Sequence, residues 1–160
     1  MFHYTPIFHA VLILRDGVIR RSSGNTPPYV WLSSNPTNEP TALRASSEQV
    51  RRCNDERMRR AIEGRARFVF HGCNATPWAN LTLTAEVRSN LEQLAAPKGG
   101  RPEEWFALPN NVSCTALPLE IEIDGSWRRI AHDDLKREYQ DLQMMDGAIR
   151  MRRSRALSPS

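Results

Sequence analysis

Two glutamates in a short apolar stretch are the first candidates for chemistry in this sequence. Glu120 and Glu122 alternate with Leu119, Ile121 and Ile123, and residues two apart on a β-strand project from the same face. Burial of two neighbouring carboxylates is costly unless they have partners. The pair therefore marks either an exposed strand face or a site where carboxylates act on a ligand.

Polar side chains also interrupt two other segments that are otherwise built for a core. His3 and Thr5 stand just before an expected helix, and Ser33 and Ser34 follow the aromatic Trp31. Hydroxyl and imidazole groups at such positions can orient a polar ligand. Taken alone, His3 favours a structural role with satisfied hydrogen bonds, so its candidacy depends on its neighbours.

The sequence lacks the signatures of several enzyme classes. It contains no GxGxxG, P-loop, GxSxG or HExxH motif. Cys53, Cys73 and Cys114 are odd in number and widely spaced, and His71 does not form a close ligand pair of the kind found in zinc sites. We therefore expect no metal site, and free, mostly buried thiols in a reducing compartment.

The composition is that of a folded protein with a basic balance. The 160 residues are 40% hydrophobic and 25% charged, which fits one domain with a core of its own. The net charge is +4, and only Lys98 and Lys136 among the 22 basic residues are lysines. Arginine favours bidentate contacts with phosphate, so the composition indicates a phosphorylated ligand or nucleic acid, or else the codon bias of a GC-rich genome.

The elements that must position these residues alternate between strands and helices. Thr5 and Pro6 resemble an N-cap and first helical residue, and Gly17 marks the end of that helix. Asp124-Gly125 is a strong hairpin signal. We expect strands at 2–4, 18–20, 29–33, 67–70, 105–107 and 119–123, and helices at 6–16, 46–63, 84–96 and 132–145. This order predicts an α+β fold with a mixed, mostly antiparallel sheet and flanking helices, not a doubly wound parallel sheet.

The expected domain covers residues 1–146, and residues 147–160 form a basic tail that we expect to be flexible. The helix that begins at the capping box of Ser46 and Gln49 carries an arginine-rich face between Arg51 and Arg60, which is typical of a solvated surface. No apolar run approaches the length that crosses a bilayer, and the first residues do not resemble a signal peptide. We therefore expect a cytoplasmic protein with no membrane contact.

Several stretches resemble, in their order, a family of small, largely uncharacterised bacterial and phage proteins. These are residues 3–5, 13–19, 30–35, 39–42, 104–107 and 122–127. The opening His3-x-Thr5, followed by a helix ending in Asp16-Gly17 and a strand bearing serine, is also similar to ADP-ribosyltransferases, above all to the DNA-modifying toxins and the tRNA 2′-phosphotransferases. The resemblance covers most of residues 1–130.

The resemblance implies an ADP-ribosyltransferase-like fold, a split and mostly antiparallel sheet whose cleft binds NAD as a substrate. His3 would then bond the ribose on the adenosine side of NAD, and Thr5 would support the turn. Ser33 and Ser34 would shape the nicotinamide pocket, where Trp31, or Tyr29 in its place, would stack.

The same resemblance implies that Glu122 is the catalytic residue. Its carboxylate would hold the 2′-hydroxyl of the nicotinamide ribose and stabilise the positive charge that grows at the anomeric carbon. Two departures from the family are visible. First, residues 31–34 stand in place of the Ser-Thr-Ser triplet of many transferases. Second, Glu120-x-Glu122 has the two-glutamate spacing of arginine-modifying toxins but lies in a strand of alternating apolar and polar residues.

The sequence thus favours an NAD-dependent ADP-ribosyltransferase that modifies a macromolecule, either nucleic acid or protein, as a toxin or in phage–host conflict. The alternative is a non-catalytic binding protein on a degenerate version of the fold. It would engage nucleic acid or a protein partner through the arginine-rich helix and the tail. The two hypotheses differ in whether NAD binds and is cleaved.

Overall fold

A computed structural model of the protein describes residues 1–23, 26–42 and 56–140. These residues form an α+β structure, and every strand pairing among them is antiparallel. The expected fold class, α+β with a mostly antiparallel sheet, is confirmed. No helix within these described ranges is long and apolar enough to cross a membrane.

The main sheet has seven strands in the order β5-β6-β3-β1-β4-β8-β9, and a small second sheet pairs β2 with β7. The strands are β1 (Phe2–Pro6), β2 (Val18–Ile19), β3 (Val30–Ser33), β4 (Arg65–Val69), β5 (Thr76–Pro77), β6 (Trp105–Leu108), β7 (Val112–Ser113), β8 (Leu119–Ile123) and β9 (Ser126–Ile130). The helices are α1 (Ile7–Asp16), α3 (Glu56–Glu63), α4 (Ala85–Ala95) and α5 (His132–Glu138), with 3-10 turns η1 (Trp78–Asn80), η2 (Ala96–Lys98) and η3 (Pro102–Glu104).

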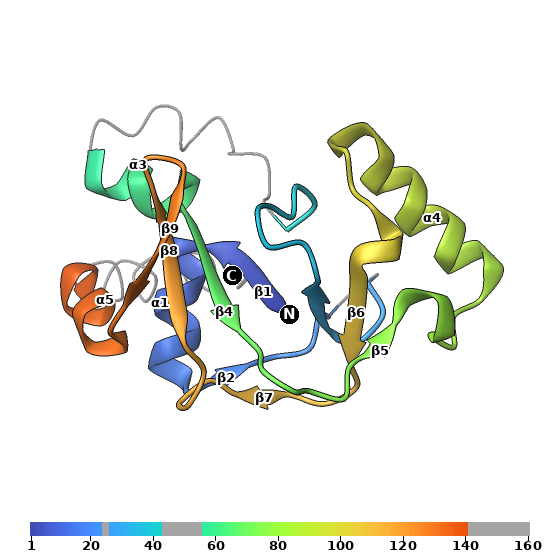
Figure 1. Ribbon diagram of the computed structural model, residues 1–160, viewed down its shortest axis with the longest axis horizontal. Coiled ribbons are helices and arrows are strands. Elements are labelled where there is room, and N and C mark those ends of the chain that lie inside the picture. Colours follow the sequence, from blue (N-terminus) through green and yellow to red (C-terminus); the bar gives the residue numbers. More distant parts are fainter. Residues whose placement is uncertain (24–25, 43–55, 141–160) are drawn as a thin grey trace, which may run out of the picture.

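The central strand of the main sheet, β1, pairs with its neighbour β3 at one position alone, Phe2 with Ser33. On its other side β1 pairs with β4 along its whole length, from Phe2 to Pro6, and β3 pairs with β6 from Val30 to Ser33. The sheet therefore opens between β1 and β3. Figure 1 shows the two halves, with β1, β4, β8 and β9 on one side and β5 and β6 on the other.

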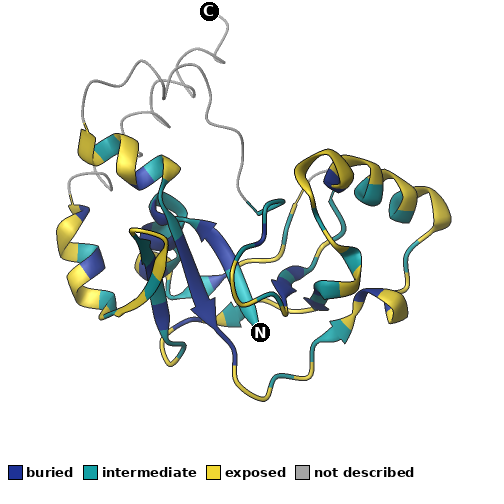
Figure 2. Ribbon diagram, turned by 45° about the horizontal axis from the view of Figure 1, so that its top comes forward, coloured by how far each residue is buried: buried dark blue, intermediate teal, exposed yellow. Residues whose placement is uncertain are grey.

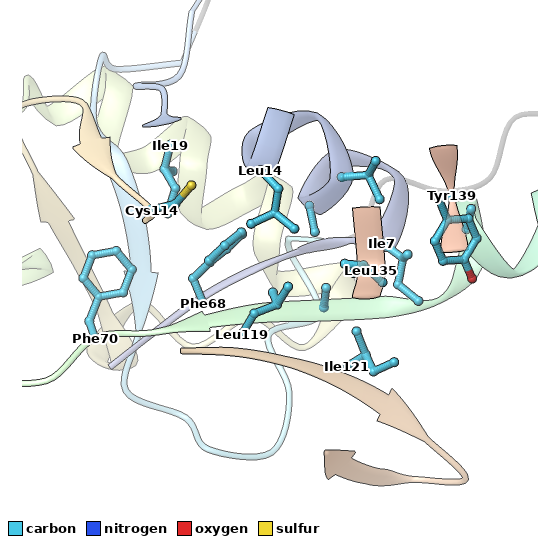
Figure 3. Packing of buried hydrophobic residues seen from close by; sticks show 14 of the residues in the cluster. Ile7, Leu14, Ile19, Phe68, Phe70, Cys114, Leu119, Ile121, Leu135 and Tyr139 are labelled. Atoms are coloured by element: carbon cyan, nitrogen blue, oxygen red, sulfur yellow. The ribbon is translucent and has the colours of Figure 1, made fainter. Parts of the chain in front are cut away.

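The larger half is built around α1, whose buried side chains recur at helical spacing. Ile7 and Leu14 belong to a cluster that includes Phe68 and Leu119 of the sheet and Leu135 of α5 (Figure 3). Phe68, Leu119 and Leu135 are almost fully buried. This packing fixes β1, which starts the chain, firmly against β4.

The smaller half has a second buried cluster beneath α4. Trp78, Trp105 and Ala107 are buried there, together with Ala95 of α4 and Leu81 of the loop that precedes it. Most of α4 beyond this contact is exposed, as Figure 2 shows. The larger cluster also includes Val30 and Leu32 of β3, so the cluster beneath α4 is an addition to a core that both halves share.

The start of α1 differs from the expectation. Thr5 does not cap the helix, because it belongs to β1 and pairs with Ala66, while Pro6 precedes the helix without a side-chain cap. The helix ends as expected at Gly17, whose φ of 71° is left-handed.

Other local signals agree with the structure more closely. Thr84 caps α4, since its side chain accepts from the backbone N–H of Val87 at 3.2 Å. Asp124 and Gly125 have φ values of 51° and 75°, the pattern of a type I′ hairpin turn. Of the helix predicted over 46–63, residues 56–63 form α3. Its predicted start, with the capping box and Cys53, and the predicted tail 147–160 lie outside the described residues.

Candidate functional site

A pocket of about 890 Å³ lies where the two halves of the sheet diverge. Its lining comes from both halves: β1 contributes His3 and Thr5, β3 contributes Trp31 and Ser33, and the loop after β3 contributes Glu39. A volume of this size is typical of sites that hold a drug-sized ligand or a cofactor. The split in the sheet therefore creates a cavity suited to a small molecule.

Four of the six residues predicted to form an NAD site line this pocket, namely His3, Thr5, Trp31 and Ser33. The other two are not among its lining residues. Ser34 donates from its backbone N–H to the carbonyl oxygen of Glu104 at 2.8 Å, which ties the end of β3 to η3. Glu122 lies on β8 in an ion pair with Arg65. The structure thus gathers the predicted binding residues and leaves the predicted catalytic residue apart from them.

His3 bridges the opening between the two halves. Its Nδ1 lies 2.9 Å from the carbonyl oxygen of Trp31, and because a carbonyl can only accept, Nδ1 carries the proton. Burial lowers the pKa of His3, opposed by this backbone hydrogen bond and reinforced by nearby His9. The imidazole is therefore neutral at pH 7, with Nε2 left as a hydrogen-bond acceptor.

Aromatic rings form the wall of the pocket on the β3 side. Tyr29 and Trp31 both line it, in an edge-to-face pair with ring centroids 5.6 Å apart. Trp31 also packs against the buried Trp78, with ring centroids 6.2 Å apart. Its Nε1 is buried and has no hydrogen-bond partner among the described residues. The wall thus offers an apolar aromatic surface to the pocket, while the indole N–H of Trp31 is enclosed by the protein.

Thr5 and Ser33 shape the pocket from buried positions. Thr5 is almost fully buried in β1, and the Ser33 hydroxyl accepts from the backbone N–H of Asn35 at 3.1 Å. That bond turns the chain at the end of β3 and starts the loop that leads to Glu39. Both side chains therefore act on the shape of the site.

Glu39 is a site residue that sequence reasoning did not single out. Only 6% of it is exposed, and it lines the pocket. Its Oε1 accepts from the backbone N–H of Thr41 at 3.2 Å and from the Thr41 hydroxyl, and its Oε2 accepts from Trp105 Nε1 at 3.2 Å. The resemblance included residues 39–42, but the sequence gives no sign that Trp105, 66 positions away, encloses this carboxylate.

Glu120 and Glu122 project from one face of β8, as the sequence predicts, and arginines of β4 cover both. Arg65 binds Glu122 through two guanidinium nitrogens, and Arg67 Nε donates to Glu120 at 2.6 Å. The Arg67 guanidinium also lies over the ring of Trp127, 4.2 Å from its centroid. The predicted carboxylate pair is thus neutralised by two cations.

The same arginines hold the loop that carries Glu39. Arg65 Nη1 donates to Asn38 Oδ1 at 2.7 Å, and Arg67 Nη1 donates to the carbonyl oxygen of Pro36. Tyr4 of β1 donates to the carbonyl oxygen of Asn35 at 2.6 Å. These three bonds fix residues 35–38 against the larger half of the sheet.

Basic side chains line the pocket near the end of α1 and the start of the loop after β2. Arg15 and Arg20 are among the lining residues, and both contact Asp16, at 2.9 and 3.6 Å. The Arg15 hydrogen bond and charge hold the pKa of Asp16 below its usual range. Lys98 of η2 adds a further lining cation. Two arginines around one carboxylate leave net positive charge, which favours an anionic ligand group.

Within residues 1–23, 26–42 and 56–140, no group of three or more His, Cys, Asp or Glu side chains is arranged to hold a metal ion. Cys73 and Cys114 are free thiols, the first half-buried and the second buried. Burial raises the pKa of Cys114, whose S–H donates to the carbonyl oxygen of Ile13 at 3.5 Å. This thiol is therefore protonated and poorly nucleophilic at pH 7.

Comparison with protein-family models, with curated proteins and with solved structures finds no match to this chain. Its function is therefore inferred from the geometry of the pocket.

Proposed function

We propose that this protein is an NAD-dependent ADP-ribosyltransferase that modifies a macromolecule. The observation that carries the proposal is the convergence of His3, Thr5, Trp31 and Ser33 on one pocket of about 890 Å³ in the opening between β1 and β3. These residues come from two strands that pair at a single position. A pocket of this size can enclose much of a dinucleotide.

The chemistry of the lining matches the parts of NAD. The neutral His3 presents Nε2 as an acceptor for a ribose hydroxyl, since Nδ1 is used by the Trp31 carbonyl. Tyr29 and Trp31 offer flat surfaces against which a base or nicotinamide ring can pack. Arg15 and Arg20 supply positive charge for the diphosphate.

In the proposed reaction the bond between the nicotinamide nitrogen and C1′ of its ribose breaks, and the electron pair leaves with neutral nicotinamide. Positive charge then develops on the ribose. A nucleophile of the macromolecule forms a bond to C1′ and releases its proton. Preorganised groups that stabilise this charge only as it develops accelerate the step.

The proposal is tested with NAD and with labelled NAD. At NAD concentrations 100-fold above Kd, binding stabilises the folded protein by about 2.7 kcal/mol, which raises Tm by several degrees. Trp31→Ala should lose most of this rise. Transfer of labelled ADP-ribose to nucleic acid or protein of a cell lysate should accompany binding.

A non-catalytic binding protein is the second candidate, favoured by the ion pair that neutralises Glu122 and by the exposed Arg59 and Arg60 of α3. It would engage nucleic acid or a protein partner through this basic helix. In that case NAD neither raises Tm nor loses its nicotinamide, and nucleic-acid binding falls steeply with salt.

A further inference from the structure

We infer that Glu39 is the catalytic carboxylate of the pocket, the group that faces the nicotinamide ribose, and that Glu122 is a positioning residue. This inference rests on the proposed function and names the group that performs its central step. Neither the resemblance nor any of the comparisons assigns a role to Glu39.

Glu39 is the one buried acidic residue among those that the structure describes. Its hydrogen-bond partners are neutral, namely the backbone and hydroxyl of Thr41 and the indole N–H of Trp105. No ion pair to Glu39 exists within the described ranges. The carboxylate is thus held in one orientation by neutral donors, without an ion-pair partner among the described residues.

Glu122 and Glu120 differ from Glu39 in their position relative to the pocket and in their hydrogen-bond partners. Each lies outside the pocket lining, and each is paired with a guanidinium. A carboxylate whose two oxygens are bound by Arg65 has little remaining field with which to stabilise a second positive charge. Of these three glutamates, Glu39 alone lines the pocket and has no guanidinium partner among the described residues.

The hydrogen bonds of Glu39 leave room for a ligand. An ionised carboxylate has about four acceptor positions, and the structure uses two on Oε1 and one on Oε2. Oε2 therefore retains one acceptor position for a ribose hydroxyl. Trp105, which also lines the pocket, keeps water from one side of the carboxylate and so strengthens its field.

Burial of a carboxylate that has no ion-pair partner is unfavourable unless a positively charged group lies beside it. NAD supplies such a group, because its nicotinamide ring is cationic before the bond breaks and the ribose becomes cationic as nicotinamide leaves. Glu39 is placed to stabilise the second state more than the first if its oxygen bonds the ribose. That difference is what accelerates the reaction.

Glu122 acts on this site through the loop. It fixes Arg65, and Arg65 binds Asn38, the residue immediately before Glu39. Loss of the Glu122 charge should therefore loosen the loop, which lowers Tm and moderately lowers turnover. It should not remove the charge that stabilises the transition state.

The test measures nicotinamide release from NAD, with water as acceptor, together with NAD binding by calorimetry. Glu39→Gln should lower kcat by about a hundredfold or more and raise Kd for NAD by a smaller factor, because the carboxylate acts more strongly on the transition state than on bound NAD. Glu122→Gln should lower kcat by about tenfold or less and lower Tm. Glu92→Gln is the matched control, because Glu92 likewise accepts an indole N–H, from Trp78 at 3.1 Å, but does not line the pocket; its kcat should equal that of the parent.

The outcomes separate the inference from the proposed function. A parent protein that does not bind NAD overturns the proposed function, and one that binds NAD without releasing nicotinamide overturns a catalytic role for any carboxylate. A parent that cleaves NAD, with Glu39→Gln equally fast or Glu122→Gln the slower of the two, overturns the assignment to Glu39 alone. If Glu39→Gln does not fold, Glu39→Asp is the deciding variant. It keeps the carboxylate but moves it away from the ribose by one methylene, so kcat should fall at least tenfold. An unchanged kcat contradicts the inference.

Discussion

His3 determines part of the pH dependence of this protein. Burial lowers its pKa in the folded state, while in the unfolded chain it titrates near its ordinary value of about 6.5. Below that value the unfolded chain binds a proton that the folded chain does not. The free energy of unfolding should therefore fall as pH drops below about 6.5, and this loss should stop once the pH lies below the pKa of folded His3.

The measurement is the free energy of unfolding by denaturant between pH 5 and 8, for the parent and for His3→Asn. The Asn side chain can still donate to the Trp31 carbonyl, because its amide nitrogen occupies the place of Nδ1, but it does not titrate. The variant should lose stability less steeply toward acid pH. Equal slopes for the two proteins would show that His3 titrates alike in both states.

Individual residues of the site differ in how far the sequence predicts them. His3 is identifiable because it is a polar residue on a short apolar strand, and Trp31 because the resemblance includes it. Glu39 is not identifiable, since its burial depends on Trp105 from another part of the chain. The partner of Glu122 is equally hidden, because Arg65 reaches it only through the register of β4 and β8. The catalytic role that the resemblance implies for Glu122 stays a prediction, and Glu122→Gln tests it against the positioning role inferred from the ion pair with Arg65.

At the scale of elements, Arg67 joins β4, β8 and the loop after β3. It is buried, it pairs with Glu120, and its guanidinium lies between the rings of Phe2 and Trp127, 4.2 Å from each centroid. Arg67→Met should lower the free energy of unfolding by about 3 kcal/mol, at the low end for breaking a buried pair because Glu120 remains partly exposed. Its effect should extend to the pocket, because the Pro36 carbonyl loses its donor.

The control for Arg67 is Arg137 of α5, which pairs with Asp134 on the surface at 3.4 Å, with both side chains more than half exposed. Arg137→Met should change the free energy of unfolding by less than about 1 kcal/mol. Denaturant unfolding of both variants makes the comparison. Equal losses would mean that Arg67 is a surface ion pair in energetic terms and does not anchor the loop.

Elements with strong local signals are predictable from the sequence, and those defined by pairing are not. The helix expected over 84–96 and the Asp124-Gly125 turn match α4 and the last hairpin, because helical periodicity and positive φ are local properties. Thr5 was a wrong prediction as a cap, because pairing of Thr5 with Ala66 extends β1 up to the helix. β5 and β7, of two residues each, are too short to show an alternating pattern.

At the scale of the molecule, the pocket is a consequence of topology. The two halves share the larger buried cluster, which includes Val30 and Leu32 of β3. Their neighbouring strands β1 and β3 nevertheless pair at one position alone, so the sheet opens there. The α+β class follows from the order of elements in the sequence, but the strand order does not. It depends on pairings between segments as distant as β3 and β6, which no local pattern encodes.

The proposed site is tested most directly by a crystal structure with an uncleavable NAD analogue, whose nicotinamide ribose carries a methylene in place of the ring oxygen. We expect the analogue in the opening between β1 and β3, with a ribose hydroxyl on His3 Nε2, a ring against Trp31, and the nicotinamide ribose within hydrogen-bond distance of Glu39. An analogue bound elsewhere, or a pocket that stays empty when calorimetry shows binding, would contradict the proposed site.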